Sequence, residues 1–152
     1  MARLYRATEL IAQARLKDSY NISTSDIDLQ NARLQKLSQQ ARDDLERSRV
    51  ENGKIKLPLF RAWSLLQELE DESLGKWFAL CRSRMQNFLK CRNSSILAHG
   101  MKPIDEAIYR KEGQEGLILC REALAAIPAS ERKGRKVQQL PRKLPFETGG
   151  NK

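Results

Sequence analysis

The fold class of this chain is decided by the stretch LGKWFALCRSRMQNFL, residues 74–89. Large apolar side chains recur in it every three or four residues, which is the period of a helix that buries one face. This apolar face consists of Leu74, Trp77, Phe78, Cys81, Met85, Phe88 and Leu89. Because such a stripe is far more often core than a ligand-binding surface, we predict that this helix contributes to the core.

Helical spacing recurs on both sides of this stretch. A first helix is expected over residues 2–19, with the apolar positions Leu4, Ala7, Ile11 and Ala14, and Leu10 beside them. A second is expected to end near Asn52-Gly53, with Leu34, Leu37, Ala41, Leu45 and Ser48 on one face. A third begins at Pro58, which suits a first helical turn, and directs inward Phe60, Trp63, Leu66 and Leu69.

A last helical region runs to Pro128 with the apolar positions Ile104, Ala107, Ile108, Leu117, Cys120, Leu124 and Ile127. Its glycines, Gly113 and Gly116, leave open whether this region is continuous, kinked or split. No alternating strand pattern bounded by a hairpin turn occurs in the sequence. The predicted class is therefore all-α, a helical bundle.

Positive charge is concentrated at the C-terminal end of the chain. The net charge is +9, and residues 131–152 carry seven basic side chains against two acidic ones. The same segment contains Pro141, Pro145 and Gly149-Gly150 and few large apolar residues, which is typical of disorder. We predict a helical domain over residues 1–130 and a flexible basic tail over 131–152. The tail either adds nonspecific affinity for RNA or is solvated without a specific role.

The composition also bears on compartment and cofactors. No apolar run approaches the ~18 to 20 residues needed to cross a bilayer, and the N-terminus lacks the apolar region of a signal peptide. Cys81, Cys91 and Cys120 are too far apart for a zinc knuckle and fit helical patterns as small apolar residues. We expect a cytoplasmic, reduced protein with no membrane contact, metal or cofactor.

The candidate chemistry lies between Arg92 and His99. His99 is the only histidine, and thus the only side chain whose unperturbed pKa suits proton transfer near neutral pH. Arg92 precedes it by seven residues, so on a continuous helix the two share a face roughly 10 Å apart along the axis. A lone histidine is more often structural than catalytic, but Arg92 and the neighbouring Asn93 favour a catalytic interpretation.

Cleavage of RNA without a metal requires activation of the 2′-hydroxyl, neutralisation of charge on the phosphorane and protonation of the departing 5′-oxygen. Arg92 can bind two phosphate oxygens at once, His99 can transfer a proton, and Asn93 can orient the phosphate or ribose. One histidine cannot be base and acid together, whereas a two-fold axis brings two copies face to face. The predicted site is therefore shared between two subunits.

Three further charged residues have two interpretations each. Lys90 and Lys102 flank the candidate site and either hold phosphates of the RNA or are ordinary surface lysines. Glu9 lies among apolar positions of the first helix, where it either orients the arginine or is a solvated charge on the helix surface.

The segment RNSSILAHG, residues 92–100, resembles the signature of HEPN ribonucleases, in which about four to six residues separate the arginine from the histidine. The wider strings SILAHGMKPI, residues 95–104, and ARLYRATELI, residues 2–11, resemble the HEPN half of the CARF-HEPN ancillary ribonucleases of type III CRISPR systems. The resemblance spans about residues 2–127. It implies an all-helical domain that dimerises through the motif helices and cleaves single-stranded RNA without a metal.

In the family that this chain resembles, cyclic oligoadenylate activates the nuclease by binding to a separate, N-terminal CARF domain. Here residues 2–11 already match the start of the HEPN half, so ligand control is in doubt. The chain is expected to be a standalone module, half of a split gene or a truncated remnant, and a separate CARF-type sensor protein would then be a partner. The alternatives are a toxin paired with a nucleotidyltransferase antitoxin, a non-catalytic RNA-binding module and a helical scaffold.

Overall fold

The computed structural model describes residues 2–94 and 105–131. Within them lie five α-helices and one 3-10 helix: α1 (Ala2–Tyr20), η1 (Leu34–Lys36), α2 (Gln39–Glu46), α3 (Leu59–Glu68), α4 (Leu74–Ser94) and α5 (Glu106–Ala126). The described residues contain no β-strand, only an isolated bridge between Arg49 and Ile55. The predicted all-α class is confirmed. The predicted boundary between residues 130 and 131 stays a prediction, because residues 132–152 lie outside the described part.

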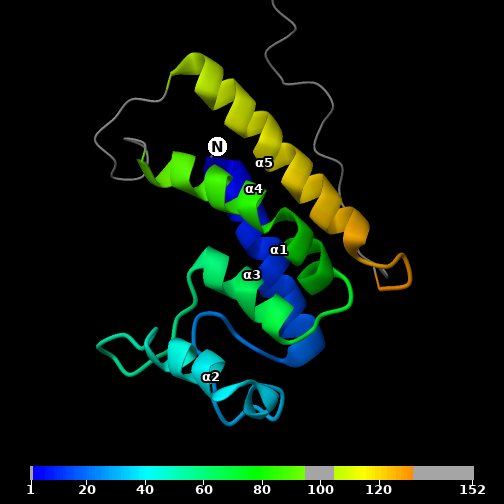
Figure 1. Ribbon diagram of the computed structural model, residues 1–152. Coiled ribbons are helices and arrows are strands. Elements are labelled where there is room, and N and C mark those ends of the chain that lie inside the picture. The colour runs from blue at the N-terminus through cyan, green and yellow to red at the C-terminus, as the bar shows by residue number, and fades with distance from the viewer. Residues whose placement is uncertain (1, 95–104, 132–152) are drawn as a thin grey trace, which may run out of the picture.

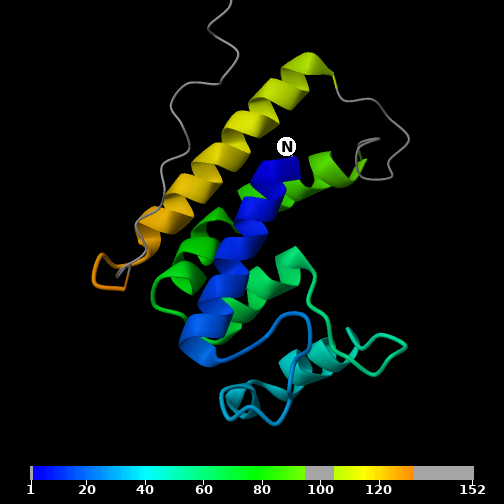
Figure 2. The same ribbon diagram turned by 180° about the vertical axis from the view of Figure 1, so that it is seen from behind.

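Four of the helices form the body of the domain. α4 packs against α3 on one side and α5 on the other, and α1 contacts all three. Figures 1 and 2 show α5 lying along α4 at one end of the molecule, whereas η1 and α2 lie at the opposite end, beyond α3. The arrangement places the C-terminal end of α4 and the N-terminal ends of α1 and α5 in the same region.

The core is built around the apolar stripe of α4, as predicted. Every residue of that stripe is buried except Trp77, which is partly buried against the core. The Trp63 ring of α3 stacks on Phe78 at 5.9 Å between centroids and contacts Trp77 at 5.2 Å. Because full burial of one large apolar side chain is worth about 1.5–3 kcal/mol, this α3–α4 layer accounts for much of the fold's stability.

Helix α1 is present as predicted; Leu4 and Ile11 pack partly buried against the core, and the most deeply buried residues lie beside them. Thr8, Ala12 and Leu16 are buried, whereas Leu10 is 48% exposed and Ala14 is also exposed. Apolar side chains occupy more than half the circumference of this helix, so their period alone does not identify the covered side. The buried Thr8 hydroxyl donates a hydrogen bond to the carbonyl of Tyr5 at 2.8 Å, which satisfies it inside the core.

The helix predicted to end near Asn52-Gly53 is shorter and interrupted. Its apolar positions from Leu34 to Leu45 are buried as expected, but Leu37 adopts an extended conformation (ψ 157°) that ends η1. Ser38 then caps α2 by accepting a hydrogen bond from the Ala41 amide at 3.2 Å. A serine that offers its own cap favours a new helix start over a continuous helix, so the prediction of one helix was wrong.

Helix α5 is continuous, so neither a kink nor a split occurs at its glycines. Asp105 begins it by accepting a hydrogen bond from the Ala107 amide at 2.8 Å. Its buried face contains Gly116, Leu119, Cys120 and Ala123, whereas three of the predicted apolar positions, Ile108, Leu117 and Leu124, are 41–51% exposed. Gly116 is retained in the helix because it is a packing site, and this removes the reason to expect a break.

Candidate functional site

Helix α4 positions the candidate site, and its first turn is fixed by Asp71. The Oδ1 atom of this buried carboxylate accepts hydrogen bonds from the backbone amides of Ser73 at 3.1 Å and Leu74 at 2.7 Å. The Oδ2 atom accepts from Arg15 Nε at 2.7 Å and from the Tyr20 hydroxyl at 2.8 Å. The same side chain therefore caps α4 and connects it to α1.

The electrostatics of this anchor agree with its geometry. Burial disfavours the ionised carboxylate, but hydrogen bonds from Arg15, Tyr20 and Ser73 outweigh it and lower the pKa of Asp71 to about 2. Burial and the hydrogen bond to Asp71 raise the pKa of Tyr20 to about 12. At neutral pH the anchor is thus a carboxylate held by a guanidinium and a neutral phenol.

Near its other end, α4 meets α1 and α5 in a junction that depends on a glycine. A Cβ atom built on Gly116 would lie 2.6 Å from Phe88 Cε2 and 3.4 Å from Leu4 Cβ, and the first distance is too short for any side chain. Outside this junction, Arg84 holds α4 to α5 through ion pairs with Glu115 at 2.7 Å and Glu122 at 2.9 Å. The last two turns of α4 are therefore held at a defined position beside the start of α1.

The structure brings three of the five predicted site residues into the last turns of α4. Lys90 and Asn93 are exposed there, and Arg92 lies between them in the helix. Position 92 follows Phe88 by four residues, one helical turn further along the same face. The helix dipole favours cations in the last turns of a helix, which suits the exposed Lys90.

The other two predicted residues, His99 and Lys102, lie outside the described residues. The expected convergence of His99 with Arg92 and Asn93 therefore stays a prediction. Glu9 is described: its carboxylate accepts hydrogen bonds from Arg6 at 2.5 Å and Gln13 at 3.3 Å, both on α1. These contacts favour the interpretation of Glu9 as a charge on the helix surface.

The cysteines behave as apolar residues. Cys81 and Cys120 are buried, and burial raises the pKa of the Cys81 thiol to about 11, so it is protonated at neutral pH. Within residues 2–94 and 105–131, no group of three or more histidine, cysteine, aspartate or glutamate side chains is placed to hold a metal ion. None of the helices described is both long and apolar enough to cross a bilayer.

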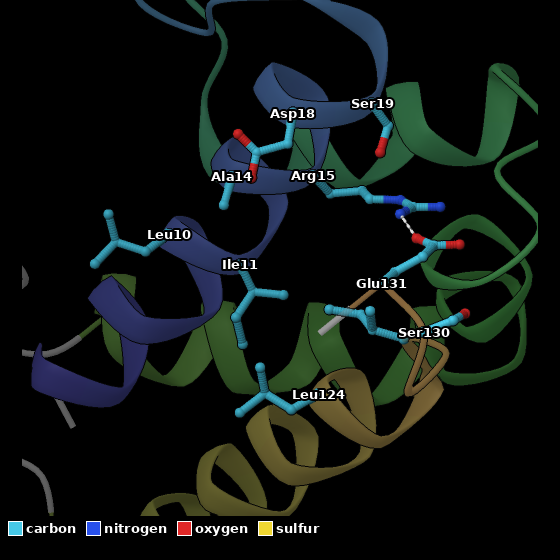
Figure 3. A pocket seen from close by; sticks show the side chains of 10 residues that line it. Leu10, Ile11, Ala14, Arg15, Asp18, Ser19, Leu124, Ser130 and Glu131 are labelled. Carbon is cyan, nitrogen blue, oxygen red and sulfur yellow. Dashed lines mark hydrogen bonds and ion pairs between the residues drawn. The ribbon is translucent and has the colours of Figure 1, made fainter. Parts of the chain in front are cut away.

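Two grooves flank α1, and the sequence analysis identified neither. The larger, about 650 Å³, lies between the C-terminal ends of α1 and α5. Figure 3 shows Ile11 pointing toward Leu124 across it, with Leu10 to one side and an ion pair between Arg15 and Glu131 at the other end. The smaller, about 360 Å³, lies between the N-terminal part of α1 and the first half of α5. The smaller groove borders the junction that positions the end of α4, because Leu4 lines this groove and also lies at the junction.

Comparison with known proteins identifies the family. The family model of the Csm6 HEPN domain matches residues 1–114, three quarters of the 152-residue chain. The match includes all the predicted site residues and extends into α5. No curated protein and no solved structure matches the chain. HEPN domains of this type are generally ribonucleases. The helical fold and this match agree: the chain belongs to the Csm6 HEPN-domain family, whose members are CRISPR-associated.

Proposed function

We propose that this chain is a metal-independent endoribonuclease that cleaves single-stranded RNA at a site shared by two copies. The observation that carries the proposal is the location of Lys90, Arg92 and Asn93 on the last turns of α4, in a chain of the Csm6 HEPN family. A permanently charged guanidinium and an uncharged amide on adjacent residues suit a phosphodiester better than a neutral substrate.

In the proposed reaction, the 2′-hydroxyl of one nucleotide attacks the adjacent phosphorus while the bond to the 5′-oxygen breaks. One His99 accepts the proton of the 2′-hydroxyl, and the second His99, from the other copy, donates a proton to the departing oxygen. Arg92 neutralises the charge that develops on the phosphorane, and Asn93 orients the phosphate or ribose. The products are a 2′,3′-cyclic phosphate and a free 5′-hydroxyl. Lys90 and Lys102 hold the neighbouring phosphates.

The need for two copies comes from the inventory of proton-transfer groups. The chain has one histidine, and the described cysteines and the partly buried Tyr20 have raised pKa values that keep them protonated at neutral pH. A homodimer that joins the motif helices supplies the second imidazole. In the cell we place this activity in the cytoplasm, in CRISPR-linked antiviral defence, with a separate CARF-type sensor protein as the regulatory partner.

One alternative keeps the fold and changes the context, a HEPN toxin neutralised by a nucleotidyltransferase antitoxin. Another keeps RNA binding without cleavage. The membership in the Csm6 HEPN family favours the CRISPR-linked ribonuclease over both.

The test is cleavage of an unstructured RNA by the purified protein in EDTA. We expect cleavage by the wild type and a loss of at least about 10³-fold with His99→Ala, because proton transfer by a positioned group contributes about 10²–10⁴-fold at each step. Arg92→Ala should reduce cleavage to a similar extent and Asn93→Ala less. Arg121→Ala and Asn87→Ala are matched controls, since both residues are exposed and lie outside the last turn of α4.

Subunit sharing is tested in the same assay by adding an excess of His99→Ala protein to the wild type. Mixed dimers should lower the activity per wild-type chain. Unchanged cleavage by a clean His99→Ala preparation would contradict the mechanism, and full activity of the wild type as a monomer at high dilution would contradict the shared site.

A further inference from the structure

The smaller groove beside α1 has the side chains of a nucleobase pocket. It is lined by Leu4, Tyr109, Arg110, Gly113, Gln114 and Leu117. The groove is shallow and open to solvent, and its volume of about 360 Å³ can accommodate one planar base lying against its surface. The N-terminal end of α1 lies beside the C-terminal part of α4 and the first half of α5 in Figures 1 and 2.

Each wall of this groove offers a different contact to a base. Tyr109 is 44% exposed and presents an aromatic ring, and Leu117, 41% exposed, adds an apolar surface. The floor is open at Gly113, where a Cβ atom would meet nothing within 4 Å. The exposed Gln114 carries an amide that can donate to and accept from a base edge. Arg110 lies at the rim, where its guanidinium is ion-paired with Glu106 at 2.7 Å. Proteins bind unpaired bases with this combination of aromatic, amide and cation.

The groove is connected to the candidate site through Leu4. This residue forms one wall of the groove and also borders the junction where Phe88 of α4 meets Gly116 of α5. Arg92 follows Phe88 by four residues, a rise of about 6 Å along α4. A single-stranded RNA bound at the end of α4 would therefore pass close to the groove.

We propose that this groove binds an unpaired nucleobase next to the cleaved phosphodiester, with Tyr109 stacking on the base and Gln114 contacting its edge. The inference rests on the proposed function and deepens it, because it assigns base recognition to the first half of α5. Gln114 is then a determinant of base preference.

The experiment uses a single-stranded oligonucleotide with 2′-O-methyl riboses and one 2-aminopurine, a fluorescent base whose emission falls when it stacks. The modified riboses lack the attacking hydroxyl, so binding is measured without cleavage. We expect quenching by the wild type and by Tyr109→Phe, which keeps the ring. Tyr109→Ala should lose the quenching and bind on the order of tenfold more weakly, as expected for loss of one stacked base.

A second variant fills the groove without weakening the helix. Gly113→Leu places a side chain on the open floor, and leucine favours helix more than glycine does. We expect weaker binding, to about the same extent as with Tyr109→Ala. Ala125→Leu is the matched control, since it adds the same side chain to an exposed position of α5 outside the groove. This control should bind like the wild type.

The outcomes separate this inference from the proposed function. If the wild type cleaves RNA but Tyr109→Ala and Gly113→Leu bind and quench normally, the groove is excluded and the ribonuclease stands. If the wild type binds with quenching that these variants lose, yet cleaves nothing, the groove stands and the ribonuclease is excluded. If sedimentation shows that Gly113→Leu disrupts self-association, the groove is a protein interface and the inference is wrong. The inference also fails if the wild type does not bind the oligonucleotide.

Discussion

The two ends of helix α4 differ in almost every physical respect. At its start, the buried carboxylate of Asp71 is bound by Arg15, Tyr20 and three backbone amides. At its end, Lys90 and Asn93 are exposed, and the last side chains described as buried on this helix are Phe88 and Leu89. The first end is fixed by many contacts of one buried side chain, whereas the second carries the exposed side chains of Lys90 and Asn93. Substitutions at the first should therefore change stability, and those at the second should change activity.

The largest effect is expected from Asp71→Ala. The substitution removes the cap of α4 and leaves Arg15 with only its exposed partner, Glu131. Breaking a buried ion pair from one side costs about 3–5 kcal/mol of unfolding free energy, and we expect a loss near 3 kcal/mol because Glu131 remains. Urea denaturation measures it. Asp105→Ala is the control, since it removes an exposed cap from α5 and should cost about 1 kcal/mol.

The same variants test whether the two ends of α4 are functionally separate. Asp71→Ala should retain RNA cleavage per folded molecule, measured well below its melting temperature. Where Asp71→Ala does not fold, the milder Asp71→Asn replaces it. A selective loss of cleavage in a folded Asp71 variant would show that the anchor also controls the site, and the comparison would fail.

Acid should lower the free energy of unfolding by protonating Asp71 at the anchored end of α4. The folded-state pKa of Asp71, about 2, is below its usual value of 3.8, so its contribution is complete above about pH 4 and is lost as the pH falls towards 2. At about 1.4 kcal/mol per pKa unit, the loss is about 2 kcal/mol. The pKa of Tyr20 is raised from 10 to about 12, so its contribution is present below pH 10 and is lost as the pH rises through 12.

Unfolding free energies measured between pH 2 and 7 test the acid limb. Asp71→Asn should flatten it relative to the wild type, since the amide does not titrate. Between pH 9 and 12, Tyr20→Phe should flatten the alkaline limb in the same way. An acid limb that is equally steep in Asp71→Asn would assign the acid sensitivity to other carboxylates.

The sequence analysis predicted the apolar stripe of α4 but not the Asp71 anchor at its start. The stripe from Leu74 to Leu89 was recognisable because large apolar residues recur with an unambiguous helical period. The Asp71 anchor was missed because its partners Arg15 and Tyr20 are 56 and 51 residues away, although Asp71 shortly before a helix is a typical capping signal. The most deeply buried side of α1 could not be identified from the sequence, because apolar residues occupy more than half of its circumference.

The candidate site was predictable only where its residues are close in sequence. Arg92 and Asn93 belong to one short motif, so their location on a single helix turn needed no knowledge of the fold. The groove between Leu4 and Tyr109 joins residues more than 100 positions apart, and no local pattern indicates which turns of α1 and α5 meet. The glycines of α5 even suggested a possible break at Gly116, the position where Phe88 packs against the helix.

Gly116→Ala should affect both stability and cleavage, with the smallest expected change in the free energy of unfolding. The new Cβ atom would lie 2.6 Å from the buried Phe88 ring, so the ring must move. Overpacking costs about 1–3 kcal/mol, and the higher helix propensity of alanine returns about 0.5–1 kcal/mol, which leaves a net loss of about 1 kcal/mol. Gly113→Ala is the matched control for stability alone, because its Cβ meets nothing within 4 Å and should stabilise the helix. Ala125→Leu, outside the groove, is the control for cleavage. Since Phe88 lies one turn before Arg92, its displacement should lower the kcat for RNA cleavage. Asp71→Ala, by contrast, should cost more stability and leave cleavage per folded molecule unchanged. Normal cleavage by a destabilised Gly116→Ala protein would show that the end of α4 keeps its position without the junction.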